Sequence, residues 1–221
     1  MSDLGYTFAH NVGRLALHEE LQRTHPEIEW DSAYVENVFF QHNSTQVLYD
    51  FAEQCDMVFS CSDATMTTEN LWAVSKLYPE VIFVVGSGSR HSQHEPVGWV
   101  PIGQKVPRNV KFYDLFTHPT WYRAGAIAAA QSSTNKIAFI TAWSEEPTCA
   151  QAVTSWKLGA QLIKPDIELH VVSLDAWYDP PAELAAAALL YEHIGCDVLA
   201  HYTDGTQTNS YCSEHGPGCH R

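Results

Sequence analysis

The run VIFVV (residues 81–85) decides the fold class predicted for this chain, because it is apolar at every position. A strand with one solvated face alternates apolar and polar residues, whereas a strand inside a parallel sheet reads as a continuous apolar run. Tyr78-Pro79 shortly before the run and Gly86 directly after it are typical strand boundaries. We therefore expect a parallel sheet with helices on both faces.

The same alternation of helix and strand extends from this run in both directions. Predicted helices cover residues 11–23, 44–54, 69–77, 121–131, 148–163 and 181–194. Predicted strands cover residues 33–38, 57–61, 81–85, 110–115, 136–141, 167–174 and 198–201. The stretch 86–108 is rich in glycine and proline and has no periodicity, so a loop or insertion is expected there. Helices alternating with strands indicate an α/β fold.

The helix–strand units form two groups, with a seam near residues 116–120. We expect an N-terminal α/β lobe over residues 1–117 and a second α/β lobe over residues 118–221. Ligands of open α/β sheets bind beyond the carboxyl ends of the strands. The segments that follow residues 61, 85, 141, 174 and 201, together with the opening loop, should therefore form a common rim.

Aromatic and short polar side chains are concentrated at this rim. The candidate ligand-binding residues are Tyr6, Phe8, His10, Asn11, Ser62, Trp143, Trp177, Asp179 and Asp204. Flat rings stack on a flat ligand, and carboxylates hold hydroxyl or ring N–H groups. Lysine and arginine are sparse here, which favours a neutral ligand over a phosphate. Individual residues have plainer interpretations, since an aromatic at a strand end often closes a core and Asp179 suits a helix N-cap.

The charge balance disfavours whole classes of partner. The chain carries 12 Lys+Arg and 26 Asp+Glu, a net charge of −14, which repels nucleic acid and anionic membranes. It has no basic start followed by an apolar run, and no apolar window of about 18 residues. As written, the sequence predicts a chain that stays in the cytoplasm. A secreted parent whose leader is missing would give the same sequence.

Catalytic and metal-binding patterns are weak. There is no GxSxG or GxxxxGK[ST] motif, and Glu145-Glu146 suits a solvated turn better than an acid–base pair. The even number of cysteines, six, permits disulfides, but their spacing is not that of a small disulfide-stabilised scaffold, and buried free thiols are expected. The tail YCSEHGPGCHR (residues 211–221) could offer zinc ligands, but we expect a frayed terminus. We therefore predict no catalytic residues, no cofactor and no metal.

Several blocks occur in the order of a known family. They are DLGYTFAHNVGRLALHEEL (3–21), YVENV (34–38), CDMVF (55–59) before Ser62, LGA and KPD (158–166), AWYDP (176–180) and HYTD (201–204). Together they resemble the basic membrane protein (BMP) family, the PnrA-like substrate-binding proteins of ABC transporters. The resemblance covers nearly the whole chain.

This resemblance implies a bilobed, type I periplasmic-binding-protein-like fold with two Rossmann-like parallel-sheet lobes. It implies a purine nucleoside or nucleobase as ligand, held between aromatic rings, and delivery to an ABC permease without catalysis. Family members are usually secreted lipoproteins, so the resemblance implies a plasma membrane-associated, periplasmic or extracellular location. Carried over by motif, Tyr6, Trp177 and Asp204 would supply stacking and hydrogen bonds.

The chain also departs from the family pattern. Ser62-Asp63-Ala64 stands where the family usually has Ser-Phe-Gly, and the turn at residues 143–147 is more acidic than the family's. The family has an apolar strand before the opening loop and further elements after the HTDS motif. The resemblance therefore implies that the first strand and the end of the second lobe are missing. The alternatives are a nucleoside-processing enzyme on a similar scaffold and a non-functional truncated copy.

Overall fold

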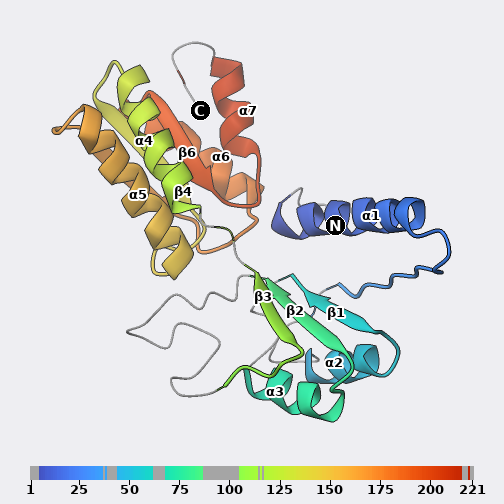
Figure 1. The fold of residues 1–221 in the computed structure, drawn as a ribbon. Helices are drawn as coiled ribbons and strands as arrows, with labels where there is room; N and C mark the ends of the chain where they lie inside the picture. The colour runs from blue at the N-terminus through green and yellow to red at the C-terminus, as the bar shows by residue number, and fades with distance from the viewer. Residues whose placement is uncertain are drawn as a thin grey trace. The chain divides into compact units, whose positions relative to one another are not determined.

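The computed structural model of the chain describes residues 5–36, 38, 44–61, 68–86, 105–113, 115, 117–215 and 219. It contains two parallel sheets with intervening helices, which confirms the predicted α/β class (Figure 1). The chain divides into two compact units, Arg14–Leu115 and Phe116–Arg221, the latter together with Met1–Gly13. The helix α1 (Tyr6–Thr24) begins in one unit and continues in the other.

The unit Arg14–Leu115 contains a small parallel sheet. Its helices are α2 (Ser44–Ala52) and α3 (Thr68–Leu77), and its strands are β1 (Met57–Ser60), β2 (Ile82–Gly86) and β3 (Val110–Tyr113), in the order β1-β2-β3. One face of the sheet, with Val58, Phe83 and Val85, is buried with Leu48 of α2 and Leu71 of α3. These elements lie where the sequence predicts them, within a few residues.

The other face of this sheet is open. Phe59 is 58% exposed and Met57 is 44% exposed, and Ile82 beside Met57 is also exposed. The prediction of helices on both faces is therefore wrong for this unit in the described residues. The apolar pattern of residues 81–85 specifies a strand, but α2 and α3 both contribute to the core on one face. The helix α1 contains no buried residue.

The strand expected over residues 33–38 does not form in its described part. Residues 31–35 are irregular, and Asn37 lies outside the described residues. Local contacts occupy this segment instead, since Arg14 donates to Ser32 at 2.6 Å and stacks on Tyr34 at 4.9 Å from the ring centroid. A strand is stable only when a neighbour satisfies its backbone groups, and no described strand pairs with this one. Residues 87–104 of the predicted loop also lie outside the described part.

The second unit is a three-layer α/β structure. Its helices are α4 (His118–Gln131), α5 (Pro147–Ile163), α6 (Pro180–Ala188), the π-helical η2 (Leu189–Ile194) and α7 (Gln207–His215). Its strands are β4 (Lys136–Thr141), β5 (Glu168–Ser173) and β6 (Val198–Tyr202), in the parallel order β5-β4-β6. Figure 1 shows α4 and α5 lying side by side.

The central strand β4 is buried on both faces, as the sequence predicts. Phe139 packs with Ala128 of α4 and Trp156 of α5. Ile140 packs on the opposite face with Leu190 of η2 and Tyr211 of α7. Both faces of this sheet are therefore covered by helices.

The C-terminal segment differs most from its prediction. Residues 207–215 form α7, and Cys212 is joined to Cys219 by a disulfide, with both cysteines almost fully buried. The expectations of a frayed tail and of free thiols at these two positions were wrong. Burial of Tyr211 and Cys212 holds α7 against the unit's core, and this contact is not visible in the local sequence. Cys149 and Cys196 are buried free thiols, as expected.

Candidate functional site

The carboxyl ends of β4, β5 and β6 meet at one edge of their sheet. Thr141 pairs with both Ser173 and Tyr202, so the three loops that follow these strands start side by side. In this unit the structure therefore places three segments of the predicted rim together. Ligands of open parallel sheets bind at this edge.

A pocket of about 540 Å³ lies between the loops that follow β4 and β5. It is lined by Trp143, Ser144, Glu145, Glu146, Asp175 and Trp177. Trp143 and Trp177, both predicted site residues, are 41% and 39% exposed. The pocket therefore combines two partly exposed tryptophans with three acidic residues, and no basic residue lines it among the residues that the structure describes.

Local hydrogen bonds shape the two loops. Ser173 donates to Asp175 Oδ1 at 2.8 Å, while the Ser144 N–H donates to the Ser173 hydroxyl at 3.2 Å. Glu146 is the N-cap of α5, because it accepts from the Cys149 N–H at 2.8 Å. Asp175 has a left-handed backbone with φ of 54°. Local hydrogen bonds therefore hold the carboxylates of both Glu146 and Asp175 in the lining of the pocket.

Asp204 joins the other two residues that the motifs single out. Its N–H donates to the Trp177 carbonyl at 2.7 Å, and its Oδ1 accepts from the Tyr6 N–H at 3.1 Å, at the start of α1. His10, one turn along α1, lies with its ring 4.2 Å from the Tyr6 ring, and its Nδ1 is 2.8 Å from the Tyr6 carbonyl oxygen. The structure thus brings together Tyr6, His10, Trp177 and Asp204.

Two further residues of this region are not among the candidate ligand-binding residues predicted from the sequence. Tyr202, at the end of β6, lies with its ring 5.8 Å from Trp177 and 5.6 Å from Trp121. Its burial raises the pKa of the Tyr202 hydroxyl above its ordinary value. Asp175 is the other; it belongs to the predicted rim after residue 174 but not to the candidate ligand-binding residues. Each of the two stands at or just after the end of a strand, two residues before a predicted site residue, and that position was the signal available in the sequence.

Among the predicted site residues that the structure describes, Trp143 and Trp177 line this pocket, whereas Tyr6, Phe8, His10, Asn11, Asp179 and Asp204 do not. Asp179 is the N-cap of α6 and accepts from the Ala182 N–H at 3.0 Å, as its plainer interpretation proposed. Phe8 and Asn11 lie partly buried on α1. Ser62 lies outside the described residues.

No group of three or more His, Cys, Asp or Glu is arranged to hold a metal ion among the residues described. None of the helices in the described part of the chain combines the length and apolarity needed to cross a membrane.

Comparison with known proteins decides the family. Residues 2–211 match the family described as ABC transporter substrate-binding protein PnrA-like. The chain belongs to this Bmp family. The resemblance of its sequence blocks is thereby confirmed, and family membership makes the chain a relative of substrate-binding components of ABC transporters.

Curated relatives of this Bmp-family chain carry different ligand names. It is 25% identical over 98% of its length to a putative ABC transporter glucose-binding protein of Haloferax volcanii, covering 49% of that protein. It is 26% identical over 97% of its length to a purine-binding protein of Brucella abortus, covering 55% of that protein. The chain therefore spans about half the length of these relatives.

Solved structures confirm the fold of this Bmp-family chain. A solute-binding protein of an ABC transporter from Conexibacter woesei has a TM-score of 0.68 at 17% identity, covering 96% of this chain and 63% of that one. Its counterpart from Aeropyrum pernix has a TM-score of 0.67 at 15% identity, covering 98% and 56%. The periplasmic-binding-protein-like fold is thus shown.

Proposed function

We propose that this chain is a substrate-binding protein that takes a purine nucleoside or nucleobase for an ABC permease. The observation that carries the proposal is the pocket lined by Trp143 and Trp177, two partly exposed tryptophans, together with Glu145 and Asp175. Indole rings stack on a planar heterocycle, and carboxylates accept from ring N–H, amino and ribose hydroxyl groups.

The charge of the pocket supports a nucleoside over a nucleotide. A phosphate ligand needs cationic donors or a cluster of backbone N–H groups, whereas the described lining of this pocket has acidic side chains and no basic ones. Placing a phosphate near Glu145 and Asp175 would set like charges against each other. Adenosine is therefore expected to bind more tightly than its monophosphate.

The second candidate ligand is a glucose-like sugar. The relative from Haloferax volcanii is named as glucose-binding, and the same pocket chemistry suits a sugar. The C–H face of a sugar packs on an aromatic ring, and carboxylates accept from its hydroxyls. The two candidate ligands differ in their contact with the aromatic rings. A purine stacks with its whole plane on an aromatic face, whereas a sugar packs with its C–H groups.

A ligand panel tests the proposal. The chain is titrated with adenine, adenosine, guanosine, inosine, adenosine monophosphate, riboflavin and glucose, and melting shifts and binding isotherms are recorded. A reversible shift with a purine base or nucleoside, and a weaker one with the monophosphate, is expected. Binding of glucose alone would replace the purine proposal, product formation would favour the enzyme alternative, and absence of cooperative melting would favour a non-functional copy.

The Trp177→Ala variant tests the pocket assignment itself. Loss of one stacking ring should remove about 1–3 kcal/mol of binding energy and abolish the purine-induced melting shift. Tyr178→Ala is the matched control, because Tyr178 is an adjacent exposed aromatic that does not line the pocket. An undiminished shift in Trp177→Ala would refute the assignment.

The partner and location belong to the same proposal. Delivery to an ABC permease requires exposure on the outer side of the membrane, either as a lipoprotein or in the periplasm. The Cys212–Cys219 disulfide supports this location, because disulfides persist in oxidising compartments. We also retain the two predicted lobes, residues 1–117 and 118–221, as part of the proposal.

A further inference from the structure

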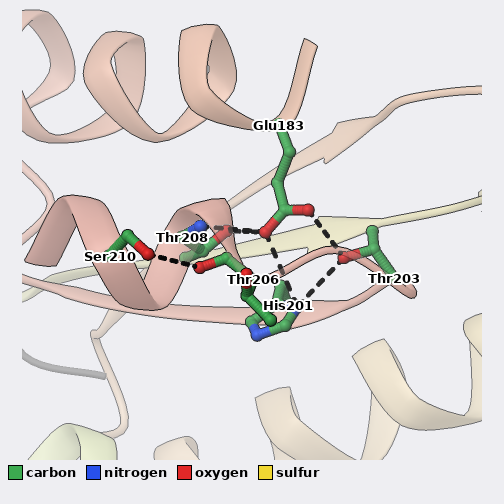
Figure 2. A network of polar contacts seen from close by, with 6 residues as sticks. All are labelled: Glu183, His201, Thr203, Thr206, Thr208 and Ser210. Atoms are coloured by element: carbon green, nitrogen blue, oxygen red, sulfur yellow. Dashed lines mark hydrogen bonds and ion pairs between the residues drawn. The ribbon is translucent and has the colours of Figure 1, made fainter. Parts of the chain in front are cut away.

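Glu183 is a buried carboxylate next to the candidate site. It lies in the first turn of α6 and is 0% exposed. A buried carboxylate is tolerated only when hydrogen bonds or an opposite charge replace its hydration. Figure 2 shows the Glu183 carboxylate pointing from α6 toward the segment that contains Thr203 and Thr208.

Three hydrogen bonds occupy the two oxygens of this carboxylate. Oε1 accepts from the Thr208 N–H and from the Thr208 hydroxyl, both at 2.8 Å. Oε2 accepts from the Thr203 hydroxyl at 3.2 Å. Because Thr203 precedes the short loop of residues 204–206 and Thr208 lies in the first turn of α7, one carboxylate holds both ends of that loop.

His201 extends the network on the side of β6. The Thr203 hydroxyl uses its proton toward Glu183, so it can only accept from His201 Nδ1, which lies 3.0 Å away. This order of donors places a proton on Nδ1. His201 Nδ1 is also 3.8 Å from Glu183 Oε1. The end of β6 and the start of the loop are therefore tied to the same carboxylate.

The loop held in this way contains Asp204. Asp204 donates to the Trp177 carbonyl and accepts from the Tyr6 N–H, so its position sets the backbone at Trp177 and the start of α1. We propose that Glu183 is a positioning residue of the ligand site, which fixes Asp204 and through it Trp177 without contacting the ligand. The expected effect of Glu183 on ligand binding rests on the proposed function, whereas its expected effect on the position of the loop does not.

The substitution that isolates this role is Glu183→Gln. It keeps the shape of the side chain but turns one acceptor oxygen into a donor amide, which then faces the donors of Thr203 or Thr208. Thr203→Val is a milder second variant, because it keeps the volume and removes one hydroxyl, which bonds to Glu183 Oε2 and to His201, while the bonds from Thr208 remain. Asp197→Asn is the matched control for both.

Asp197 suits this purpose because it is a second buried carboxylate of the same unit, at the opposite end of β6. It is 6% exposed and accepts from the Ser132 hydroxyl at 2.6 Å, the Ser133 N–H at 2.6 Å and the Thr134 N–H at 3.0 Å. Its loss therefore removes hydrogen bonds of the same kind far along the strand from Asp204.

Hydrogen exchange of the ligand-free protein tests the positioning role directly. Glu183→Gln should accelerate exchange of the Asp204 and Thr208 amides by about tenfold or more, as expected for the loss of about one charged hydrogen bond. Thr203→Val should accelerate Asp204 by a smaller factor. Asp197→Asn should leave both amides at the wild-type rate. Wild-type exchange rates in both Glu183→Gln and Thr203→Val would overturn the inference.

Adenosine binding tests the consequence for the site. Glu183→Gln and Thr203→Val should raise the Kd for adenosine, by about tenfold for Glu183→Gln, whereas Asp197→Asn should leave it within about twofold even if its melting temperature falls equally. If Asp197→Asn raised the Kd for adenosine as much as Glu183→Gln does, Glu183 would only stabilise the fold and would have no positioning role. If the wild-type protein binds no nucleoside, the proposed function fails, while the exchange rates still decide the positioning role. If Glu183→Gln does not fold, both measurements are made on Thr203→Val.

Discussion

At the scale of single residues, position 205 has no space for a side chain larger than that of glycine. A Cβ built on Gly205 would overlap the Glu183 carboxylate, whereas a Cβ on Gly13 in α1 would meet nothing within 4 Å. The Glu183 carboxylate cannot easily move away from such a Cβ, because hydrogen bonds from Thr203 and Thr208 hold it in place. An added methyl group at position 205 would therefore strain the surrounding hydrogen-bond network.

Gly205→Ala is therefore expected to destabilise the protein by about 2 kcal/mol through overpacking. Gly13→Ala, its control, should be neutral or stabilising by up to about 1 kcal/mol, because alanine favours an exposed helix. Urea unfolding of the two variants measures both values. Equal stability of Gly205→Ala and wild type would contradict the close approach.

Asp197 gives a prediction on acid sensitivity. Burial opposes its ionisation, but hydrogen bonds from Ser132, Ser133 and Thr134 outweigh burial and lower the pKa of Asp197 from 3.8 to about 2. The unfolded chain therefore binds more protons than the folded chain between these values. The contribution to stability, about 2 kcal/mol, is complete above the unfolded pKa and is lost as pH falls toward the folded pKa.

This prediction is checked by urea unfolding of wild type and Asp197→Asn at several pH values from about 5 down to about 2.5. The stability difference between the two proteins should shrink as the pH falls, because the asparagine cannot titrate. A difference that stays constant over this range would show that the Asp197 pKa is not lowered.

At the scale of elements, α7 and its disulfide close the second unit. Tyr211 and Cys212 of α7 are buried in the same cluster as Ile140 of β4, and the Tyr211 hydroxyl donates to Glu192 at 2.7 Å. A short helix is marginal in isolation, so packing and the covalent link supply its stability.

Reduction of the Cys212–Cys219 bond should lower stability by about 2 kcal/mol, the size expected for a loop with a sequence separation of 7. The melting temperature of wild type should fall in dithiothreitol, and Cys219→Ser should melt lower without any further response to the reductant. A wild-type melting temperature that dithiothreitol does not change would argue against the bond.

At the scale of the molecule, the two sheets differ in how they are covered. The sheet β5-β4-β6 is packed by helices on both faces, whereas the sheet β1-β2-β3 is buried on one face and open on the other. Phe59 and Phe83 lie in the neighbouring strands β1 and β2. Phe59 is 58% exposed, whereas Phe83 is 0% exposed. The same side chain should therefore have very different energetic weight at the two positions.

Phe83→Ala should cost about 3–5 kcal/mol because it opens a cavity in the core. Phe59→Ala should cost less than about 1 kcal/mol, and it should slow self-association measured by light scattering, since it removes exposed apolar area. Urea unfolding compares the two variants. Equal destabilisation would show that the outer face of this sheet is covered in solution.

The sequence by itself determined the α/β class, the family and most element positions. These follow from local features, namely apolar runs such as residues 136–141, proline and glycine boundaries, and the helix cap at Asp179. Its motifs also identified Tyr6, Trp177 and Asp204, which the structure joins through hydrogen bonds of Asp204. Whether these residues contact a ligand stays a prediction.

Only the tertiary structure decided what depends on neighbours distant in the sequence. In the sequence Glu183 looks like an ordinary helix residue among alanines, yet it is buried against Thr203, which follows β6, and Thr208, in the first turn of α7. The strand expected over residues 33–38 needed a pairing partner, and the Cys212–Cys219 bond needed α7 to pack on the core. The periodicity of a sequence shows which face of a helix or strand is apolar. Burial, strand pairing and the formation of a pocket depend on which other elements pack against it in the folded chain.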